Sequence, residues 1–323
     1  MKKRVFYIIL LIFLITITSD RQLERFIENL KNLRYLISIP DGYGKDTVLK
    51  WPVLLFLHGS NEMGNDLLKV NENGPPKLIK EGKKLPFIVI SPQLRYFQFW
   101  NPDLLMNLLK KISSEYRVDE DRLYLTGLSM GGFGTWYTAM KYPDLFAAIA
   151  PVCGGGNPKD AWKIRHLQVW IFHGAKDHTV PLSRSVEMAS SLVQYGNLRF
   201  TIYPEADHDS WTETYSNDSL YTWFLSHRRF RFTEDNIQIP PENFIGKYSA
   251  GKDFADIIQK NGELVIRFNN SDTGNKVLHH SKEGSFYFDK NSLKEIKYIL
   301  DRNGKMISFI FYNETPKTYF RVR

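Results

Sequence analysis

Cysteine is nearly absent from this chain of 323 residues, since Cys153 is the only one. A single thiol forms no intramolecular disulfide, so a disulfide-built scaffold is excluded and the fold has to depend on a hydrophobic core. Hydrophobic residues make up 43% of the chain, which is typical of a globular protein and excludes a long disordered or collagen-like chain. We predict that Cys153, which follows an apolar run, is a small buried packing residue.

Apolar runs long enough to span a membrane are also lacking, because a span needs about 20 residues. The longest run, 5–15, follows three basic residues at positions 2–4, and the small residue Ser19 lies just beyond it. This order predicts a secretory signal peptide over 1–19, and therefore a secreted or periplasmic protein with no stable membrane association after cleavage. An uncleaved membrane anchor is the alternative.

An excess of positive over negative charge is found only near the two ends of the chain. The formal net charge is +8, yet residues 20–235 hold 26 basic and 25 acidic residues. The excess lies in the three basic residues of 1–19 and in 236–323, which holds 14 basic and 10 acidic residues. A nearly neutral main part carries no broad phosphate-binding face, so we expect no nucleic-acid partner.

Seven short apolar runs with helical stretches between them organise the first two thirds of the chain. Several runs are continuously apolar, as in parallel strands that are covered on both faces. The pattern predicts an α/β fold with a doubly wound, mostly parallel sheet in a domain over 20–230. The predicted strands are 33–39, 53–57, 87–91, 122–126, 146–150, 169–172 and 199–203, and amphipathic helices are expected over 103–114 and 183–195.

The pattern changes after about residue 231. Pro240 and Pro241 fit neither a helix interior nor a central strand, so 231–243 is predicted to be a linker. Short strand-like runs with polar turns follow, and they predict a small all-β domain over 244–323. The predicted strands are 264–268, 276–280, 285–288, 296–300 and 306–312, with a hairpin turn at 301–304 between the last two.

The segment Gly127-Leu128-Ser129-Met130-Gly131 has the form G-x-S-x-G and lies between a predicted strand and a predicted helix. In this context the motif makes a sharp turn that leaves the serine hydroxyl exposed above the sheet. We therefore predict that Ser129 is a nucleophile. A base must accept its proton, and an acid must orient that base.

Asp177 and His208 each lie a few residues beyond a later predicted strand, in the chain order that such a triad requires. We predict Asp177 as the acid and His208 as the base. His178 is adjacent to Asp177 and is expected to point elsewhere, and His173 is expected to pack against the loop. The rival acids flank His208 too closely to hold its far nitrogen; they are Asp207 and Asp209.

A glycine-containing turn, His58-Gly59-Ser60, follows the strand predicted at 53–57. Such a turn can aim a backbone N–H at a developing oxyanion, so the N–H groups of Ser60 and Met130 are the predicted oxyanion hole. His58 precedes Ser129 in the chain, and we predict a structural role for its ring. This chemistry needs no metal and no cofactor, and none is predicted.

These motifs together resemble one known group of proteins over residues 33–226. The group is the bacterial α/β-hydrolases related to feruloyl and acetylxylan esterases and to polyhydroxybutyrate depolymerases, which are also classified with the prolyl oligopeptidase or phospholipase/carboxylesterase families. Ser60-Asn61 departs from the small residue and glycine that the family often has there. The residues that carry the resemblance are Leu57-His58-Gly59, Glu62-Met63-Gly64, Ser91-Pro92-Gln93, Val118-Asp119, 122–132, 173–177 and His208-Asp209-Ser210-Trp211.

The resemblance implies a secreted serine carboxylic ester hydrolase that works through an acyl-enzyme. It implies an ester partner that is a small molecule or is linked to a polysaccharide, and feruloyl or acetyl groups on carbohydrate fit an exported enzyme. Trp211 and Trp100 are candidate residues of the substrate pocket. The tail 244–323 resembles the small β domain appended to some bacterial serine hydrolases.

Two other functions are compatible with parts of the sequence. A serine peptidase of the prolyl oligopeptidase type shares the triad, but those enzymes carry a large N-terminal propeller domain, and only about 12 residues lie between 1–19 and the first strand. A non-catalytic binding protein on a hydrolase scaffold would have a broken triad, whereas all three members are present here.

Overall fold

The computed structural model describes residues 33–45, 47–235, 240–269 and 274–322. The chain divides into two compact units, Met1–Arg229 and Phe230–Arg323, and each is described by itself. The predicted signal peptide, 1–19, lies outside the described residues. Within the described ranges, no helix is both long and apolar enough to cross a membrane.

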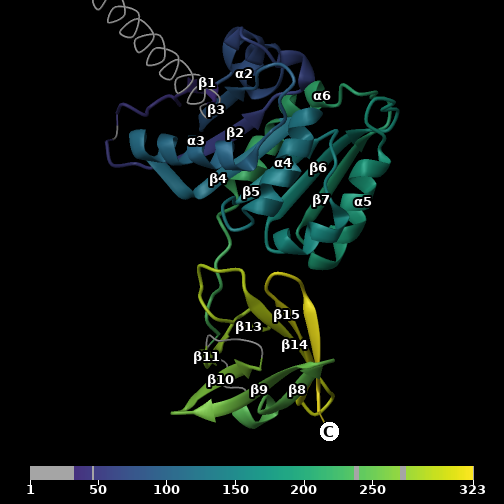
Figure 1. Cartoon of the computed structure of the whole chain (residues 1–323). Helices are drawn as coiled ribbons and strands as arrows, with labels where there is room; N and C mark the ends of the chain where they lie inside the picture. Colours follow the sequence, from purple (N-terminus) through teal and green to yellow (C-terminus); the bar gives the residue numbers. More distant parts are fainter. Residues whose placement is uncertain (1–32, 46, 236–239, 270–273, 323) are drawn as a thin grey trace, which may run out of the picture. The chain divides into compact units, whose positions relative to one another are not determined.

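The first unit is built on a seven-stranded sheet with the order β1-β3-β2-β4-β5-β6-β7 (Figure 1). β1 pairs antiparallel with β3, and all other neighbours are parallel. Each strand overlaps a predicted one, so the α/β prediction is confirmed. The strands are β1 (Arg34–Ser38), β2 (Trp51–Leu57), β3 (Ile88–Gln93), β4 (Val118–Leu128), β5 (Ala148–Val152), β6 (Gln168–Gly174) and β7 (Leu198–Tyr203).

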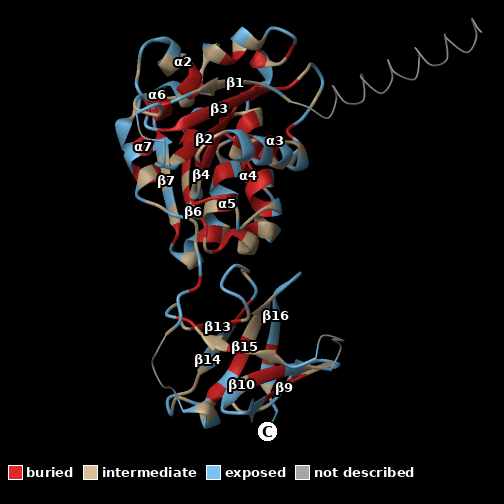
Figure 2. Ribbon diagram, turned by 90° about the vertical axis from the view of Figure 1, so that its left-hand side faces the viewer, coloured by how far each residue is buried: buried red, intermediate tan, exposed pale blue. Residues whose placement is uncertain are grey.

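Successive residues of the central strands enter two different apolar clusters, one on each face of the sheet. In β2, Val53, Leu55 and Leu57 belong to the first cluster, while Leu54 and Phe56 belong to the second. Helices α3, α4 and α5 contribute to the first cluster, and α2, α6 and α7 contribute to the second. Both faces are covered, which explains why 53–57 is continuously apolar and why the strands are buried (Figure 2). The helices are α2 (Gly74–Lys80), α3 (Pro102–Glu115), α4 (Met130–Lys141), α5 (Ser183–Leu192), α6 (Trp211–Ser216) and α7 (Asp218–Leu225).

Short polar signals set the ends of these helices. The side chain of Asn101 accepts the N–H of Asp103, and Pro102 occupies the first turn, so α3 begins there. α5 continues into a 3-10 turn, η4 (Val193–Tyr195), and ends at Gly196, whose φ of 71° is left-handed. Both ends lie within a few residues of the predicted ones.

The second unit is an antiparallel sheet with the order β11-β10-β9-β8-β16-β15-β14-β13-β12. Its two outermost strands, β11 and β12, are separated in the chain only by Leu278, whose N–H donates to the carbonyl of Leu264 at 2.9 Å. The two ends of the strand order therefore follow one another directly in the chain, and the sheet surrounds an apolar core, so the all-β prediction is confirmed. The strands are β8 (Gly246–Ala250), β9 (Asp253–Lys260), β10 (Glu263–Phe268), β11 (Lys276–Val277), β12 (His279–His280), β13 (Ser285–Tyr287), β14 (Glu295–Leu300), β15 (Met306–Tyr312) and β16 (Lys317–Arg321).

Sequence reasoning missed three of these strands, β8, β9 and β16. β8 and β16 pair with each other although they lie at opposite ends of the unit. Each is short, and each buries only one residue completely, Tyr248 in β8 and Tyr319 in β16. A strand with so few apolar residues is stabilised by its distant partner, so its own sequence carries little signal.

Part of the predicted linker 231–243 takes part in the second unit. Glu234 forms an isolated antiparallel bridge with Ser281, and Pro241–Asn243 forms a 3-10 turn, η5. Residues 236–239 lie outside the described ranges.

The first turn of α4 lies so close to the sheet that it leaves room only for glycine. A Cβ added to Gly131 would lie 1.9 Å from the carbonyl oxygen of Leu57, and one added to Gly127 would lie 2.4 Å from the carbonyl oxygen of Gly131. Both contacts are with backbone, so no side-chain rotation can relieve them. The two glycines of the G-x-S-x-G motif are therefore required by the close approach of helix and strand.

We expect Gly131→Ala to lower the free energy of unfolding by roughly 3 kcal/mol, at the upper end of overpacking costs. The seven tryptophans all lie in the first unit, so urea unfolding followed by tryptophan fluorescence reports on that unit. Gly44→Ala is the matched control, because a Cβ there meets nothing within 4 Å, and it should change the free energy by less than about 0.5 kcal/mol. Equal effects of the two substitutions would contradict the close-approach argument.

Candidate active site

Ser129 lies at the sharp turn between β4 and α4, in a backbone conformation that side chains rarely adopt. Its φ is 52° and its ψ is −116°. The N–H of Ser129 donates to the carbonyl of Val152 at 3.0 Å and also points at Sγ of Cys153, at 3.3 Å. A strained residue persists only where its surroundings hold it, and such residues cluster at functional sites.

His208 connects Ser129 with Asp177. The Nε2 atom of His208 lies 2.9 Å from Oγ of Ser129, and its Nδ1 atom lies 2.8 Å from Oδ2 of Asp177. The three residues come from loops that follow β4, β6 and β7, and the carboxyl ends of these parallel strands meet at one edge of the sheet. The structure thus brings the predicted nucleophile, base and acid into one hydrogen-bonded chain.

The carboxylate of Asp177 is held in place by its own loop. Its Oδ1 atom accepts the backbone N–H groups of Thr179, at 2.9 Å, and Val180, at 2.8 Å. The side chain is fully buried, and only Oδ2 faces the imidazole of His208. The fixed carboxylate can hold Nδ1 protonated, which leaves Nε2 free to accept a proton from Ser129.

The rival residues have other hydrogen-bond partners, although Nε2 of His173 also lies 3.3 Å from Oδ2 of Asp177. His178 is exposed, and its backbone N–H donates to Oδ1 of Asp207 at 3.2 Å. Asp209 precedes the N-cap of α6, and its Oδ1 atom accepts the backbone N–H of Thr212 in the first turn of that helix, at 2.9 Å. The ring of His173 is buried against the loop, with Nδ1 2.7 Å from Oγ of Ser185 and Nε2 2.9 Å from the carbonyl of Val180. Burial lowers the pKa of His173, so the neutral ring is favoured there.

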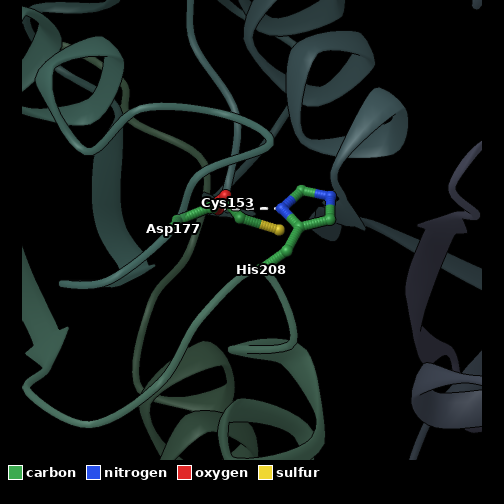
Figure 3. Close-up of side chains that lie close together, drawn as sticks. All are labelled: Cys153, Asp177 and His208. Atoms are coloured by element: carbon green, nitrogen blue, oxygen red, sulfur yellow. Dashed lines mark hydrogen bonds and ion pairs between the residues drawn. The ribbon is translucent and has the colours of Figure 1, made fainter.

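Cys153 packs beneath the site, close to Asp177 and His208 (Figure 3). One potential metal-ligand atom from each of the three residues lies within 4.8 Å of the other two. Burial raises the pKa of the Cys153 thiol to about 12, so the thiol stays protonated. A protonated thiol is a weak nucleophile and a poor metal ligand. Cys153 therefore serves as a buried packing residue whose sulfur faces the N–H of Ser129.

The two predicted oxyanion donors lie at the starts of short helices. Met130 is the first residue of α4, and Ser60 is the first residue of the 3-10 turn η1 (Ser60–Glu62). Gly59, which precedes Ser60, packs against Leu128, since a Cβ added to Gly59 would lie 2.7 Å from Cδ1 of Leu128. The turn after β2 thus lies against the residue that precedes the nucleophile.

His58 supports this turn from inside the protein. Its Nε2 atom accepts the N–H of Leu94 at 3.0 Å, and its Nδ1 atom donates to the carbonyl of Gly59 at 2.5 Å. Burial lowers the pKa of His58 to about 4, although the bond to the Gly59 carbonyl acts in the opposite direction. The ring is therefore neutral near pH 7.

An apolar cavity of about 420 Å³ opens beside Ser129. Trp100 lines it, and the Nε1 atom of Trp100 donates to the carbonyl of His58 at 3.2 Å. Trp211 packs edge-on against His208, with ring centroids 5.3 Å apart, and does not line this cavity. The cavity is lined by Phe99, Trp100, Ser129, Met130, Phe133, Gly134 and Tyr137.

Sequence reasoning missed Phe99, Phe133 and Tyr137. Phe133 and Tyr137 are four residues apart in α4, so they share a helix face, and Phe133 lies four residues after Ser129. Helical spacing from the predicted nucleophile could have identified both. Phe99 lies in the loop after β3, where no periodic signal exists.

Comparisons with known proteins found several esterases. The chain is 23% identical over 180 residues to "Probable feruloyl esterase C" of Aspergillus terreus, a match that covers 52% of this chain and 63% of that protein. It is 27% identical over 151 residues to poly(3-hydroxyalkanoate) depolymerase C of Paucimonas lemoignei, covering 42% of this chain and 34% of the relative. The chain thus matches less than two thirds of the length of either relative.

A solved structure described as a thermostable esterase is 28% identical to this chain, with a TM-score of 0.53 and coverage of 61% of this chain and 60% of the other. The family model described as "Putative esterase" matches residues 31–226, which is more than half of the chain. These residues span the sheet of the first unit and the loops that hold Ser129, Asp177 and His208. The chain belongs to this Esterase family.

Proposed function

We propose that the protein is a serine carboxylic ester hydrolase whose catalytic triad is Ser129, His208 and Asp177. The observation that carries this proposal is the hydrogen-bonded chain from Oγ of Ser129 through both ring nitrogens of His208 to Oδ2 of Asp177. Membership of the Esterase family and the esterases among the relatives support the same chemistry.

The first half of the reaction forms an acyl-enzyme. Oγ of Ser129 attacks the ester carbonyl carbon while its proton passes to Nε2 of His208, and Asp177 stabilises the resulting imidazolium. The tetrahedral intermediate then expels the alcohol, which takes the proton from Nε2. In the second half, water gives a proton to Nε2 of His208 as it attacks the acyl carbon. The new tetrahedral intermediate then expels Oγ of Ser129, which takes that proton back from Nε2, and the carboxylic acid is released.

The backbone N–H groups of Met130 and Ser60 are our proposed donors to the oxyanion. Met130 begins α4, so its N–H is among those that the helix itself leaves without a partner, and the positive end of the helix dipole adds to it. Ser60 begins η1 in the turn that packs against Leu128. Donors of this kind act mainly on the developing charge of the transition state.

The cavity beside Ser129 supports an apolar, aromatic group in the substrate. Its walls are mainly aromatic, and a volume of about 420 Å³ is enough for a phenolic acyl group and much more than an acetyl group needs. Phe99 is 80% exposed and Tyr137 is 49% exposed, so bound substrate could cover them. We propose a feruloyl-type ester, with its carbohydrate part outside the cavity, as the substrate class.

We further propose that the protein is exported by the segment 1–19. The catalytic domain would then span 20–230, with the linker 231–243 and the small β domain 244–323 following it. The basic and apolar order of the first residues supports export, and the division of the structure at Arg229 supports the two-domain organisation.

Ser129→Ala should reduce kcat for p-nitrophenyl acetate and methyl ferulate by about 10⁴-fold or more, because the nucleophile of the triad is lost. Ser219→Ala is the matched control, since Ser219 is an exposed serine in α7. Steady-state hydrolysis of both esters and of proline-containing peptides is the measurement. Full activity of Ser129→Ala would overturn the ester-hydrolase proposal, and peptide cleavage without ester cleavage would favour a peptidase.

The paired substitution Phe99→Ala and Tyr137→Ala should raise KM for methyl ferulate about tenfold, because each ring loses contact with the phenolic group. KM for p-nitrophenyl acetate, whose acyl group is small, should change less than threefold. Phe320→Ala, which replaces an exposed phenylalanine that does not line the cavity, is the control. Equal changes for both esters would show that the cavity does not select the acyl group.

A further inference from the structure

Asn73 lies at the start of α2, where an asparagine usually caps the helix, yet its side chain makes no capping bond. Both ends of its amide are directed elsewhere. Nδ2 donates to Oε1 of Glu62, and Oδ1 accepts the indole N–H of Trp211 at 3.0 Å. The side chain of Asn73 therefore does not cap α2, and instead it joins two segments that are far apart in the sequence.

Glu62, at one end of this link, is a buried carboxyl group with an incomplete set of partners. Only 1% of its surface is exposed, and Oε2 makes no hydrogen bond within the described residues. Burial raises the pKa of Glu62, while the bond from Asn73 acts in the opposite direction. Nδ1 of His58 lies 4.0 Å from Oε2, beyond hydrogen-bond distance. A buried carboxyl oxygen without a hydrogen bond costs stability, so its presence here calls for a local reason.

The position of Glu62 behind the turn at Gly59 and Ser60 explains why a carboxyl group is buried here. A Cβ added to Gly59 would lie 3.3 Å from Oε2 of Glu62, so the carboxyl group packs directly behind the backbone that leads into Ser60. The backbone of Glu62 is itself fixed from β3, because Nε2 of Gln93 donates to its carbonyl at 2.8 Å. The turn that carries a proposed oxyanion donor is thus supported from behind by Glu62.

Trp211, at the other end of the link, contacts the proposed catalytic base. Its ring lies edge-on to the ring of His208, with centroids 5.3 Å apart and planes at 89°. The indole N–H is directed away from His208, toward Asn73. The same tryptophan therefore packs against the imidazole and is joined, through Asn73, to Glu62 in the turn after β2.

We propose that Glu62, Asn73 and Trp211 form a positioning chain that fixes the oxyanion turn relative to the loop of His208. None of the three needs to touch the reacting atoms. Each acts through another residue, Glu62 through the backbone at Gly59 and Ser60, and Trp211 through His208. The proposal rests on the ester hydrolase function proposed above. Its consequence is that loss of a link misplaces catalytic groups without emptying the substrate cavity.

The experiment compares Trp211→Phe, which keeps a ring beside His208 but loses the N–H, with Asn73→Ala and with the double variant. Each single variant should lower kcat for p-nitrophenyl acetate about tenfold with little change in KM. The double variant should be no slower than Asn73→Ala, because both changes break the same bond. Glu62→Gln, which can still accept from Asn73, should stay within about threefold of wild type, whereas Glu62→Leu should lose more than tenfold.

Trp170→Phe is the matched control for a merely structural effect. It removes a similar bond, from Nε1 of Trp170 to Oγ1 of Thr201 at 2.9 Å, in β6 and β7. It should leave kcat unchanged. Unchanged kcat in Trp211→Phe, or additive losses in the double variant, would overturn the positioning proposal. The proposed function would still hold if ester hydrolysis by the wild type depends on Ser129.

A second readout does not depend on activity. In protein with ¹⁵N-labelled tryptophan, the indole signal of Trp211 is identified by its absence in Trp211→Phe. We expect Glu62→Leu to shift this signal, although Glu62 and Trp211 are joined only through Asn73. An unshifted signal would contradict the chain whether or not the wild type hydrolyses esters.

Discussion

The bond between His208 and Ser129 requires two loops of very different sequence position to meet within hydrogen-bond distance. Parallel strands make this possible, because β4 and β7 end at the same edge of the sheet, and so does β6, which leads to Asp177. The sheet alone does not fix the distance. The first turn of α4, directly after Ser129, also approaches β2 so closely that only glycine fits at position 131.

Buried polar groups around the site follow from the same geometry. Side chains help to hold the loops that carry Ser129, Asp177 and His208, and three of the polar residues near these loops, His58, Glu62 and His173, are buried. Burial lowers the pKa of both histidines and raises the pKa of Glu62, which favours the neutral form of each. Neutral groups can be buried at far lower cost than ions, so the direction of each pKa shift agrees with the burial of the group.

The sequence predicts the site best where a reactive residue type directly follows a recognisable strand. Ser129, Asp177 and His208 were identified because each follows a recognisable strand, and the structure brings them together. The aromatic residues of the cavity and the contacts of Asn73 were not identified. Phe99 lies in a loop whose path depends on tertiary packing, and nothing in the sequence around Asn73 indicates that its side chain leaves α2 uncapped to reach Trp211.

The aromatic residues that line the cavity differ in exposure from those in the core of the second unit. In the second unit, Phe286 and Phe309 are buried in the apolar core of the antiparallel sheet, so they offer no surface for stacking on a ligand. In the first unit, Phe99 and Tyr137 are largely exposed and line the cavity beside Ser129. Exposed aromatic surface is costly unless something covers it, and here it lies next to the proposed nucleophile. We therefore propose that the ester is selected in the first unit, by side chains that α4 and the loop after β3 place around Ser129.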